Sequence, residues 1–391
     1  MLALDNVKIL DLSDGLTCAL ATKYLVDNGA EVVKIEKISG DKTRSWEPKK
    51  NGGSLYFHYL NSGKKSITLD IESEYGKEIF KKLIGVYDVV CTNSEPGYME
   101  SIGLGYEELK KIKPELIYAS CTYFGDNGPM KYKKASSLVA QARGVAMDMT
   151  GVENGYPVKA SPSIAEHYTA AYLSTAILLA LIDKKIRGIG QKIDISLQDC
   201  IFSSIEAAPA AFSVLGHIHT RKGNFDPAAA PYDTYKTSDG YVAIGCSTQD
   251  QWEKLCDALH FDDLKFDERF NTGDKRRDNY FSDLQGILSE RFITMGKNDV
   301  KTKCMESGIP CAAVMNIAEI TNLHDISENG FLTASIDKKF GQIRFPALPF
   351  KLSNTESAVW NHSPELGENT EEILKEIGIN DYIFSCEKEI M

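Results

Sequence analysis

Val7-Lys8-Ile9-Leu10-Asp11-Leu12 is predicted to be a short strand, and it opens a pattern that recurs along the first half of the chain. A helix is expected over Ala19 to Asn28, ended by Gly29, because glycine tolerates the positive φ of a C-terminal cap. A second strand with an apolar middle is predicted by Glu31-Val32-Val33-Lys34-Ile35-Glu36. A strand, a helix and a strand within about thirty residues have the size of a βαβ unit.

The alternation of strands and helices continues beyond this unit. Further strands are predicted at Lys65 to Asp70, Asp88 to Thr92, Leu116 to Ser120 and Gln191 to Leu197, and helices at Glu72 to Gly85, Tyr106 to Ile112, 164 to 186 and 198 to 215. Such alternation predicts an α/β fold, in which helices cover the faces of a mostly parallel sheet.

The sequence changes character near residue 220. Gly223 to Pro231 holds two prolines and an alanine triplet, which is typical of a loop. The elements predicted after it are strands at Tyr241 to Gly245 and Arg344 to Leu352, and helices at Gln249 to Leu259, Arg276 to Phe292 and Thr370 to Ile377. A chain of 391 residues exceeds the usual single domain, so we expect a second domain that begins near 220 and ends near 330.

Composition limits the classes of function. The net charge of -11 disfavours unaided nucleic-acid binding, which needs a basic face, but a locally basic pocket can still bind an anionic ligand. Met1 to Asp5 lacks the basic and apolar segments of a signal peptide. The most apolar segment, Ala170 to Ile182, is too short to span a bilayer and is expected to be a buried core helix. We therefore expect a cytoplasmic protein without a membrane partner.

Common cofactor and metal motifs are missing from the sequence. The turn after the first strand holds the single glycine Gly15 rather than G-x-G-x-x-G, and neither a P-loop nor a G-x-S-x-G motif occurs. The nine cysteines form no C-x-x-C pair and no metal spacing, which predicts reduced thiols. His217-Ile218-His219 has no third ligand nearby, so no metal site is expected.

Three groups of charged residues stand out. The basic pairs Lys64-Lys65 and Lys133-Lys134 belong either to solvated faces or to sites that receive phosphates. Glu166 begins the long apolar helix predicted from residue 164. A carboxylate in that place is either favoured by the helix dipole or used in chemistry, because burying it unpaired is costly.

Short motifs along the chain occur in an order typical of one family. They are Gly29-Ala30-Glu31 to Glu36 with Gly40-Asp41 and Arg44, Asn61 with Lys64 to Asp70, Pro96-Gly97 with Gly103-Leu104-Gly105-Tyr106, Gly125 with Gly128-Pro129, Gly190 to Ser196, Pro231-Tyr232, Gly308-Ile309-Pro310-Cys311 and Leu366 to Thr370. On these motifs nearly the whole chain resembles the class III CoA-transferases. That family includes formyl-CoA, carnitine and aryl-lactate CoA-transferases and also the α-methylacyl-CoA racemases.

The resemblance implies an interlocked homodimer, in which two chains are linked like rings. It also implies two domains. Residues 1–200 form the first part of a large Rossmann-like domain, and a linker at 201–224 leads to a smaller α/β domain at 225–325. Residues 326–391 form a second linker and return to the large domain.

The resemblance also implies a reaction, the transfer of CoA from an acyl-CoA donor to a free carboxylic acid. A side-chain carboxylate attacks the donor thioester, and enzyme-bound anhydride and thioester intermediates follow. Relatives carry Asp in this register, and Glu166 occupies it here. The chemistry requires no metal and no tightly bound cofactor, since CoA and acyl-CoA are substrates.

The expected CoA groove involves Lys37, Arg44, the loop from Asn93 to Gly97, and Tyr123. Tyr232 and Gln249 are weaker candidates for the acyl pocket. The alternative is a relative that binds CoA thioesters with altered or lost transferase activity, either racemase-like or a non-catalytic subunit. A two-base racemase is disfavoured, because Ala135 to Val139 lacks the histidine of that branch.

Overall fold

The computed structural model describes residues 2–379, which form two compact units. The first unit contains residues 2–147, 159–217 and 325–379. The second unit contains residues 148–158 and 218–324.

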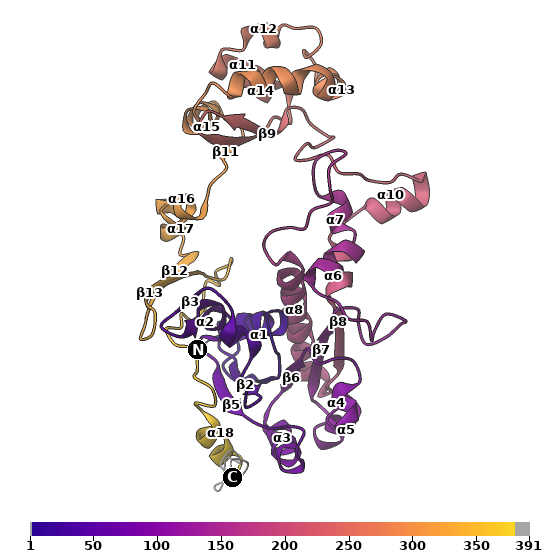
Figure 1. The fold of residues 1–391 in the computed structure, drawn as a ribbon, viewed down its shortest axis with the longest axis vertical. Coiled ribbons are helices and arrows are strands. Elements are labelled where there is room, and N and C mark those ends of the chain that lie inside the picture. The colour runs from indigo at the N-terminus through magenta and orange to yellow at the C-terminus, as the bar shows by residue number, and fades with distance from the viewer. Residues whose placement is uncertain (1, 380–391) are drawn as a thin grey trace. The chain divides into compact units, whose positions relative to one another are not determined.

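The first unit is built on a six-stranded parallel sheet (Figure 1). Its strands are β1 (Lys8–Asp11), β2 (Glu31–Glu36), β5 (Lys65–Thr68), β6 (Val89–Thr92), β7 (Ile117–Thr122) and β8 (Lys192–Ser196). Their order is β5-β2-β1-β6-β7-β8. The strands that follow β1 in the sequence, β2 and β5, lie on one side of it, and β6, β7 and β8 lie on the other side. The predicted α/β fold with a parallel central sheet is confirmed.

Apolar side chains cover both faces of this sheet, because successive residues of a strand point to opposite sides. In β1, Ile9 belongs to a core cluster with α1 (Thr17–Val26) and α8 (Ile164–Arg187), whereas Leu10 belongs to a cluster with α3 (Glu74–Val86). Val89 and Val90 of β6 divide between the two clusters in the same way. The continuous apolar runs of these strands therefore reflect burial on two faces.

The remaining elements of the first unit are mostly short. They are η1 (Lys42–Ser45), β3 (Lys49–Lys50), β4 (Gly53–Ser54), α2 (Leu55–Asn61), α4 (Tyr98–Ser101), α5 (Tyr106–Ile112), α6 (Ser137–Arg143), α7 (Ala146–Met149, at the border of the units), α9 (Leu197–Ser203), α10 (Ala208–Leu215), β12 (Leu332–Asp337), β13 (Gly341–Pro346) and α18 (Thr370–Glu376). The helix expected over 198–215 is thus two helices. Pro209 lies in the first turn of α10, a position where its missing N–H costs no helical hydrogen bond.

The C-terminal part of the chain closes the edge of β5. Asn369 accepts a hydrogen bond from the Ser66 N–H (3.1 Å) and donates its own N–H to the Ser66 carbonyl (2.8 Å). The Thr370 hydroxyl accepts the Thr68 N–H at 3.1 Å. These bonds satisfy backbone groups that an edge strand otherwise leaves exposed.

Helix α8 has one buried and one exposed face. Ala165, Leu173 and Ile177 are fully buried in the core cluster that also holds α1. By length and composition α8 is the one helix among residues 2–379 that could cross a membrane, but such a helix is weak evidence for a membrane span. The expectation of a buried core helix therefore holds for one face only.

The second unit contains an antiparallel sheet of order β11-β10-β9. Its elements are β9 (Tyr232–Thr237), β10 (Gly240–Gly245), β11 (Cys311–Ala313), α11 (Gln249–Leu259), α12 (Asp262–Lys265), α13 (Gly273–Asp278), the π-helix η2 (Tyr280–Leu284), α14 (Gln285–Phe292), α15 (Lys297–Glu306), α16 (Ile317–Thr321) and α17 (His324–Glu328, at the border of the units). The single helix expected over Arg276 to Phe292 is thus divided by η2. Trp252 and Phe292 are fully buried in the core of this unit.

The cysteines of the described chain are all free thiols, and Cys386 lies outside the described residues. Within residues 2–379 no group of three or more His, Cys, Asp or Glu side chains is placed to hold a metal ion.

Candidate active site

The turn after β1 and the loop after β6 meet where the strand order of the sheet reverses. The Asp14 N–H donates to Asn93 Oδ1, and Asn93 Nδ2 donates to the Asp14 carbonyl, both at 3.0 Å. Helix α1 begins two residues after Gly15, without a capping side chain and without an acidic residue in its first turn. In open α/β sheets, ligands bind outside the carboxyl ends of the strands at such a reversal, and a helix N-terminus there favours anions.

Most of the predicted CoA-binding residues follow the carboxyl ends of parallel strands and therefore lie along one edge of the sheet. Lys37 follows β2 and is exposed. Asn93 and Gly97 lie in the loop after β6, where Gly97 adopts a φ of 84° at the start of α4. Tyr123 follows β7 directly.

Arg44 is already engaged within the fold. Its Nε and Nη2 atoms donate to the two carboxylate oxygens of Glu36 at 2.8 and 2.7 Å, and its guanidinium lies 3.8 Å from the centre of the Phe57 ring. Burial raises the pKa of Glu36, but the hydrogen bonds and charge of Arg44 hold it below its usual value. This bidentate pair anchors η1 against β2, and the proposed contact of Arg44 with CoA stays a prediction.

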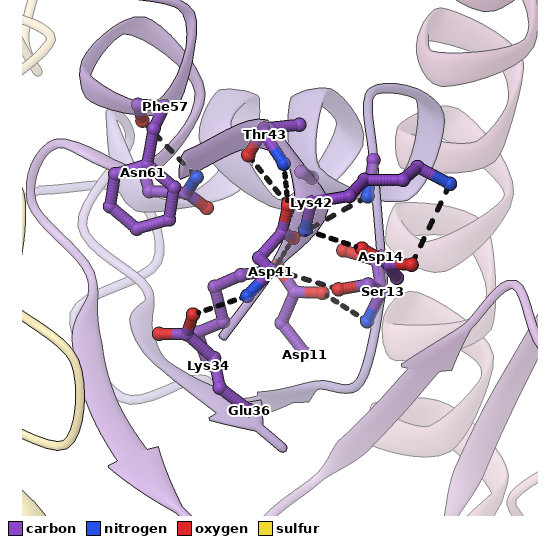
Figure 2. A network of polar contacts seen from close by, with 12 residues as sticks. Asp11, Ser13, Asp14, Lys34, Glu36, Asp41, Lys42, Thr43, Phe57 and Asn61 are labelled. Atoms are coloured by element: carbon purple, nitrogen blue, oxygen red, sulfur yellow. Dashed lines mark hydrogen bonds and ion pairs between the residues drawn. The ribbon is translucent and has the colours of Figure 1, made fainter. Parts of the chain in front are cut away.

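A buried network of charges lies beneath the turn after β1 (Figure 2). The Lys34 ammonium lies 2.7 Å from Asp41 and donates to the Ser13 carbonyl at 2.7 Å, and both side chains of the pair are buried. Asp41 Oδ1 also accepts the Thr43 N–H and hydroxyl, at 2.7 and 2.6 Å. Burial lowers the pKa of Lys34, but Asp11, Asp41 and Glu36 outweigh it and raise the pKa above its usual value.

Lys64 extends this network, whereas the sequence indicated either a solvated face or a phosphate-binding site for it. Its fully buried ammonium lies 2.9 Å from Asp11 Oδ2. It also donates to the Ala19 carbonyl at 2.9 Å and to Asn61 Oδ1 at 3.0 Å. Neither a solvated face nor a phosphate-binding role fits a lysine whose donors are all used inside the fold.

Glu166 lies in the first turn of α8. The chain passes from α8 through a short connection into β8, which runs parallel to β7, so α8 runs antiparallel to the strands and begins at their carboxyl edge. The side chain is half-buried, and its Oε2 accepts a hydrogen bond from the Ser137 hydroxyl at 2.9 Å. Within the described chain no second donor to this carboxylate is found, so one oxygen keeps its lone pairs for chemistry.

The hydrogen bond to Glu166 is supported by a second polar side chain that the sequence reasoning missed. Gln141 is 1% exposed, and its Nε2 donates to Ser137 Oγ at 3.4 Å. Its Oε1 accepts the Ala160 N–H at 3.1 Å. Ser137 and Gln141 are separated by four positions on α6, and this i, i+4 spacing of two polar residues is the sequence signal that could have indicated them.

The pKa of Tyr123 is raised above its usual value. Burial raises the pKa of the Tyr123 phenol, and the negative charge of Glu166 raises it further, followed by Cys121. The ring is 40% exposed, so it remains open to a ligand. Tyr123 and Glu166 both belong to the first unit, whereas Tyr232 and Gln249 belong to the second unit.

The first unit therefore presents a parallel α/β sheet with Glu166 and most of the predicted CoA-binding residues along the carboxyl edge of its strands. The sequence model of the family described as "CoA-transferase family III" matches residues 4–370. The chain therefore belongs to this family.

Two named CoA-transferases are similar to this chain over almost its full length. The chain is 33% identical to the succinyl-CoA:mesaconate CoA-transferase of Haloarcula hispanica, over 96% of this chain and 97% of that protein. It is 32% identical to the succinyl-CoA:glutarate CoA-transferase of Mus musculus, over 96% of this chain and 87% of that protein. A CAIB/BAIF family protein from Brucella suis has a similar crystal structure, with a TM-score of 0.89, 32% identity and coverage of 96% and 99% of the two chains.

Proposed function

We propose that the protein is a CoA-transferase that moves CoA from an acyl-CoA donor to a free carboxylic acid, with Glu166 as the nucleophile. The observation that carries the proposal is the half-buried Glu166 at the carboxyl edge of the sheet, held by Ser137 through one oxygen only. A carboxylate that paired fully with cations, as Glu36 does with Arg44, would be structural. Glu166 makes no ion pair within the described residues.

The reaction follows from a carboxylate nucleophile and a thioester. Glu166 attacks the acyl carbon and displaces the CoA thiolate, which gives a mixed anhydride between the side chain and the donor acid. The thiolate then attacks the Glu166 carbonyl, forms a glutamyl thioester and releases the donor acid. The acceptor acid takes its place by the same steps in reverse, so the energy of the thioester bond is kept throughout.

We place CoA at the strand reversal, near Lys37, Asn93, Gly97 and Tyr123, as a substrate rather than a tightly bound cofactor. Lys42 is a further cation for its phosphates. The Lys42 side chain is half-exposed and passes close to Gly15. A Cβ atom added to Gly15 would lie 2.7 Å from Lys42 Cε, so a glycine leaves room for the lysine. An exposed lysine beside the start of α1 suits a phosphate group.

The substrates we propose are dicarboxylic acids and their CoA thioesters, since the relatives named above act by name on succinyl-CoA with mesaconate or glutarate. The strand order, which corresponds to 3-2-1-4-5-6 when the strands of the sheet are numbered along the chain, supports a Rossmann-like large domain. We also propose the domain limits given above from the sequence. We further propose a cytoplasmic location, without a membrane or nucleic-acid partner.

A homodimer is supported by the exposed face of α8. Apolar or small side chains recur there at alternating steps of four and three residues, the spacing of helices that pack along a seam. They are Tyr168, Tyr172, Thr175, Leu179, Ile182 and Ile186. The apolar helix α10 has no buried residue. Surfaces of this kind are usually covered, and we propose that a second copy of the chain covers them.

Trapping of the intermediate tests the nucleophile. The protein is incubated with succinyl-CoA and then treated with hydroxylamine or borohydride, and the peptide that contains Glu166 is examined by mass spectrometry. We expect modification at Glu166, no exchange activity in Glu166→Gln, and retained CoA binding in that variant. Glu74→Gln is the matched control, because it removes a carboxylate from the first turn of α3.

Two results contradict the proposal in different ways. Full exchange activity in Glu166→Gln would assign the chemistry to another group. CoA binding without exchange in the wild-type protein, tested over a panel of acids, would favour the alternative of a CoA-binding relative or a non-catalytic subunit.

A further inference from the structure

Glu166 ends a directed chain of hydrogen bonds. The Ala160 N–H donates to Gln141 Oε1, Gln141 Nε2 donates to Ser137 Oγ, and Ser137 Oγ donates to Glu166 Oε2. The Ala160 atom in this contact is the backbone nitrogen, which can only donate, so the bond fixes which end of the Gln141 amide is the acceptor. Gln141 then presents its NH2 group to Ser137, and the serine proton is left for the carboxylate.

This direction distinguishes the two oxygens of Glu166. Oε2 carries the hydrogen bond and is the poorer nucleophile, whereas Oε1 has no donor within the described residues. In the proposed reaction Oε1 is therefore the oxygen that bonds to the acyl carbon and becomes the bridging oxygen of the anhydride. Oε2 becomes the carbonyl oxygen on the enzyme side of that anhydride.

We propose that Ser137 is a catalytic residue that stabilises the oxyanion formed on Oε2, a role that rests on the proposed function of Glu166. When the CoA thiolate attacks Cδ of Glu166, a C–S bond forms and the electron pair of the Cδ–Oε2 double bond moves onto Oε2. The pair returns as the Cδ–Oε1 bond breaks and the donor carboxylate leaves. The Ser137 hydroxyl, already 2.9 Å from Oε2, meets this charge without rearrangement.

Gln141 is a positioning residue in this arrangement. It does not touch Glu166, but it keeps the Ser137 hydroxyl from turning toward other acceptors. Its own burial is tolerated because both ends of its amide are hydrogen-bonded. A chain of such bonds also polarises each member toward the last acceptor.

Steady-state kinetics of Ser137→Ala tests the role. Loss of one oxyanion donor lowers kcat by about 10²–10³-fold in other acyl-transfer enzymes, and we expect a loss of about 10²-fold here. The KM for the acyl-CoA should stay unchanged, because the bond strengthens only when charge develops. Ser137→Thr, which keeps the hydroxyl, should restore most of kcat.

Ser136→Ala is the matched control. Ser136 precedes Ser137, is exposed, and makes no side-chain cap to α6, so its loss should leave kcat unchanged. Ser137→Cys, a weaker donor of similar size, should fall between alanine and the wild type, and it serves if Ser137→Ala does not fold.

A wild-type kcat in either Ser137→Ala or Ser137→Cys would overturn the proposal for Ser137, and so would a lower kcat that Ser137→Thr does not restore. These outcomes are separate from failure of the proposed function, because the trapping experiment shows independently whether wild-type Glu166 forms an adduct.

Discussion

The substitution Lys64→Met removes a buried charge and three hydrogen-bond donors while keeping the length of the side chain. Lys64 is bonded to Asp11, the Ala19 carbonyl and Asn61. Removing one partner of a buried ion pair typically costs about 3–5 kcal/mol. We expect about 3 kcal/mol, the lower end, since Asp11 keeps hydrogen bonds from the Thr22 hydroxyl and the Ser13 N–H.

Urea unfolding followed by circular dichroism measures this loss. Hydrogen exchange of peptides that cover β1 shows whether the transition belongs to the first unit. Lys65→Met is the control. Lys65 is partly exposed and pairs with Glu372 at 2.8 Å, and an exposed pair of this kind contributes about 0–1 kcal/mol. Equal losses for the two variants, or a loss under about 1 kcal/mol for Lys64→Met, would refute the argument from burial.

The same variant should be more sensitive to acid. Burial raises the pKa of Asp11, but the ammonium groups of Lys64 and Lys34 outweigh it and hold the pKa well below its usual value. Such a carboxyl group stabilises the fold above its unfolded pKa of about 3.9, and that contribution is lost as pH falls below it. Without Lys64 the folded pKa rises, so the midpoint of acid unfolding should move to higher pH. An unchanged midpoint would show that Lys64 does not hold Asp11 ionised.

Two further predictions concern packing. Ile182→Glu, on the exposed face of α8, should convert the dimer to a monomer, as measured by size exclusion with light scattering. Val86→Glu, at the exposed end of α3, is the control and should leave the dimer intact. If Ile182→Glu stays dimeric, the interface lies elsewhere. Gly190→Ala should destabilise the first unit by about 3 kcal/mol in thermal unfolding, because its Cβ would lie 2.1 Å from the Leu116 carbonyl oxygen. Gly85→Ala has open space and should change stability by less than about 1 kcal/mol, so equal effects would contradict the clash.

Local patterns were sufficient to predict the sheet of the first unit. Ile9 and Leu10 are both apolar because the strand is covered on both faces, and this produces the short apolar runs from which the strands were predicted. Glu166 could be located because it begins a long apolar helix, which is also a local pattern.

Contacts between distant segments could not be predicted in this way. Lys64 stands beside Lys65 in the sequence, and only the fold shows that one is buried against Asp11 while the other reaches Glu372. The bond between Ser137 and Glu166 joins residues separated by 29 positions on two different helices. Such pairings depend on how helices pack, and no periodicity of a single segment encodes them.

The closure of β5 by the end of the chain has a consequence for the order of events during synthesis. Thr68 and Thr370 are separated by 302 positions. At about 5–20 residues per second, the ribosome takes about 15–60 s to pass from one to the other. Throughout that interval β5 has an open edge while the second unit is being made, and an open edge is the part of a sheet most prone to pair with another chain. We therefore expect nascent chains that stop before residue 370 to aggregate or to recruit chaperones.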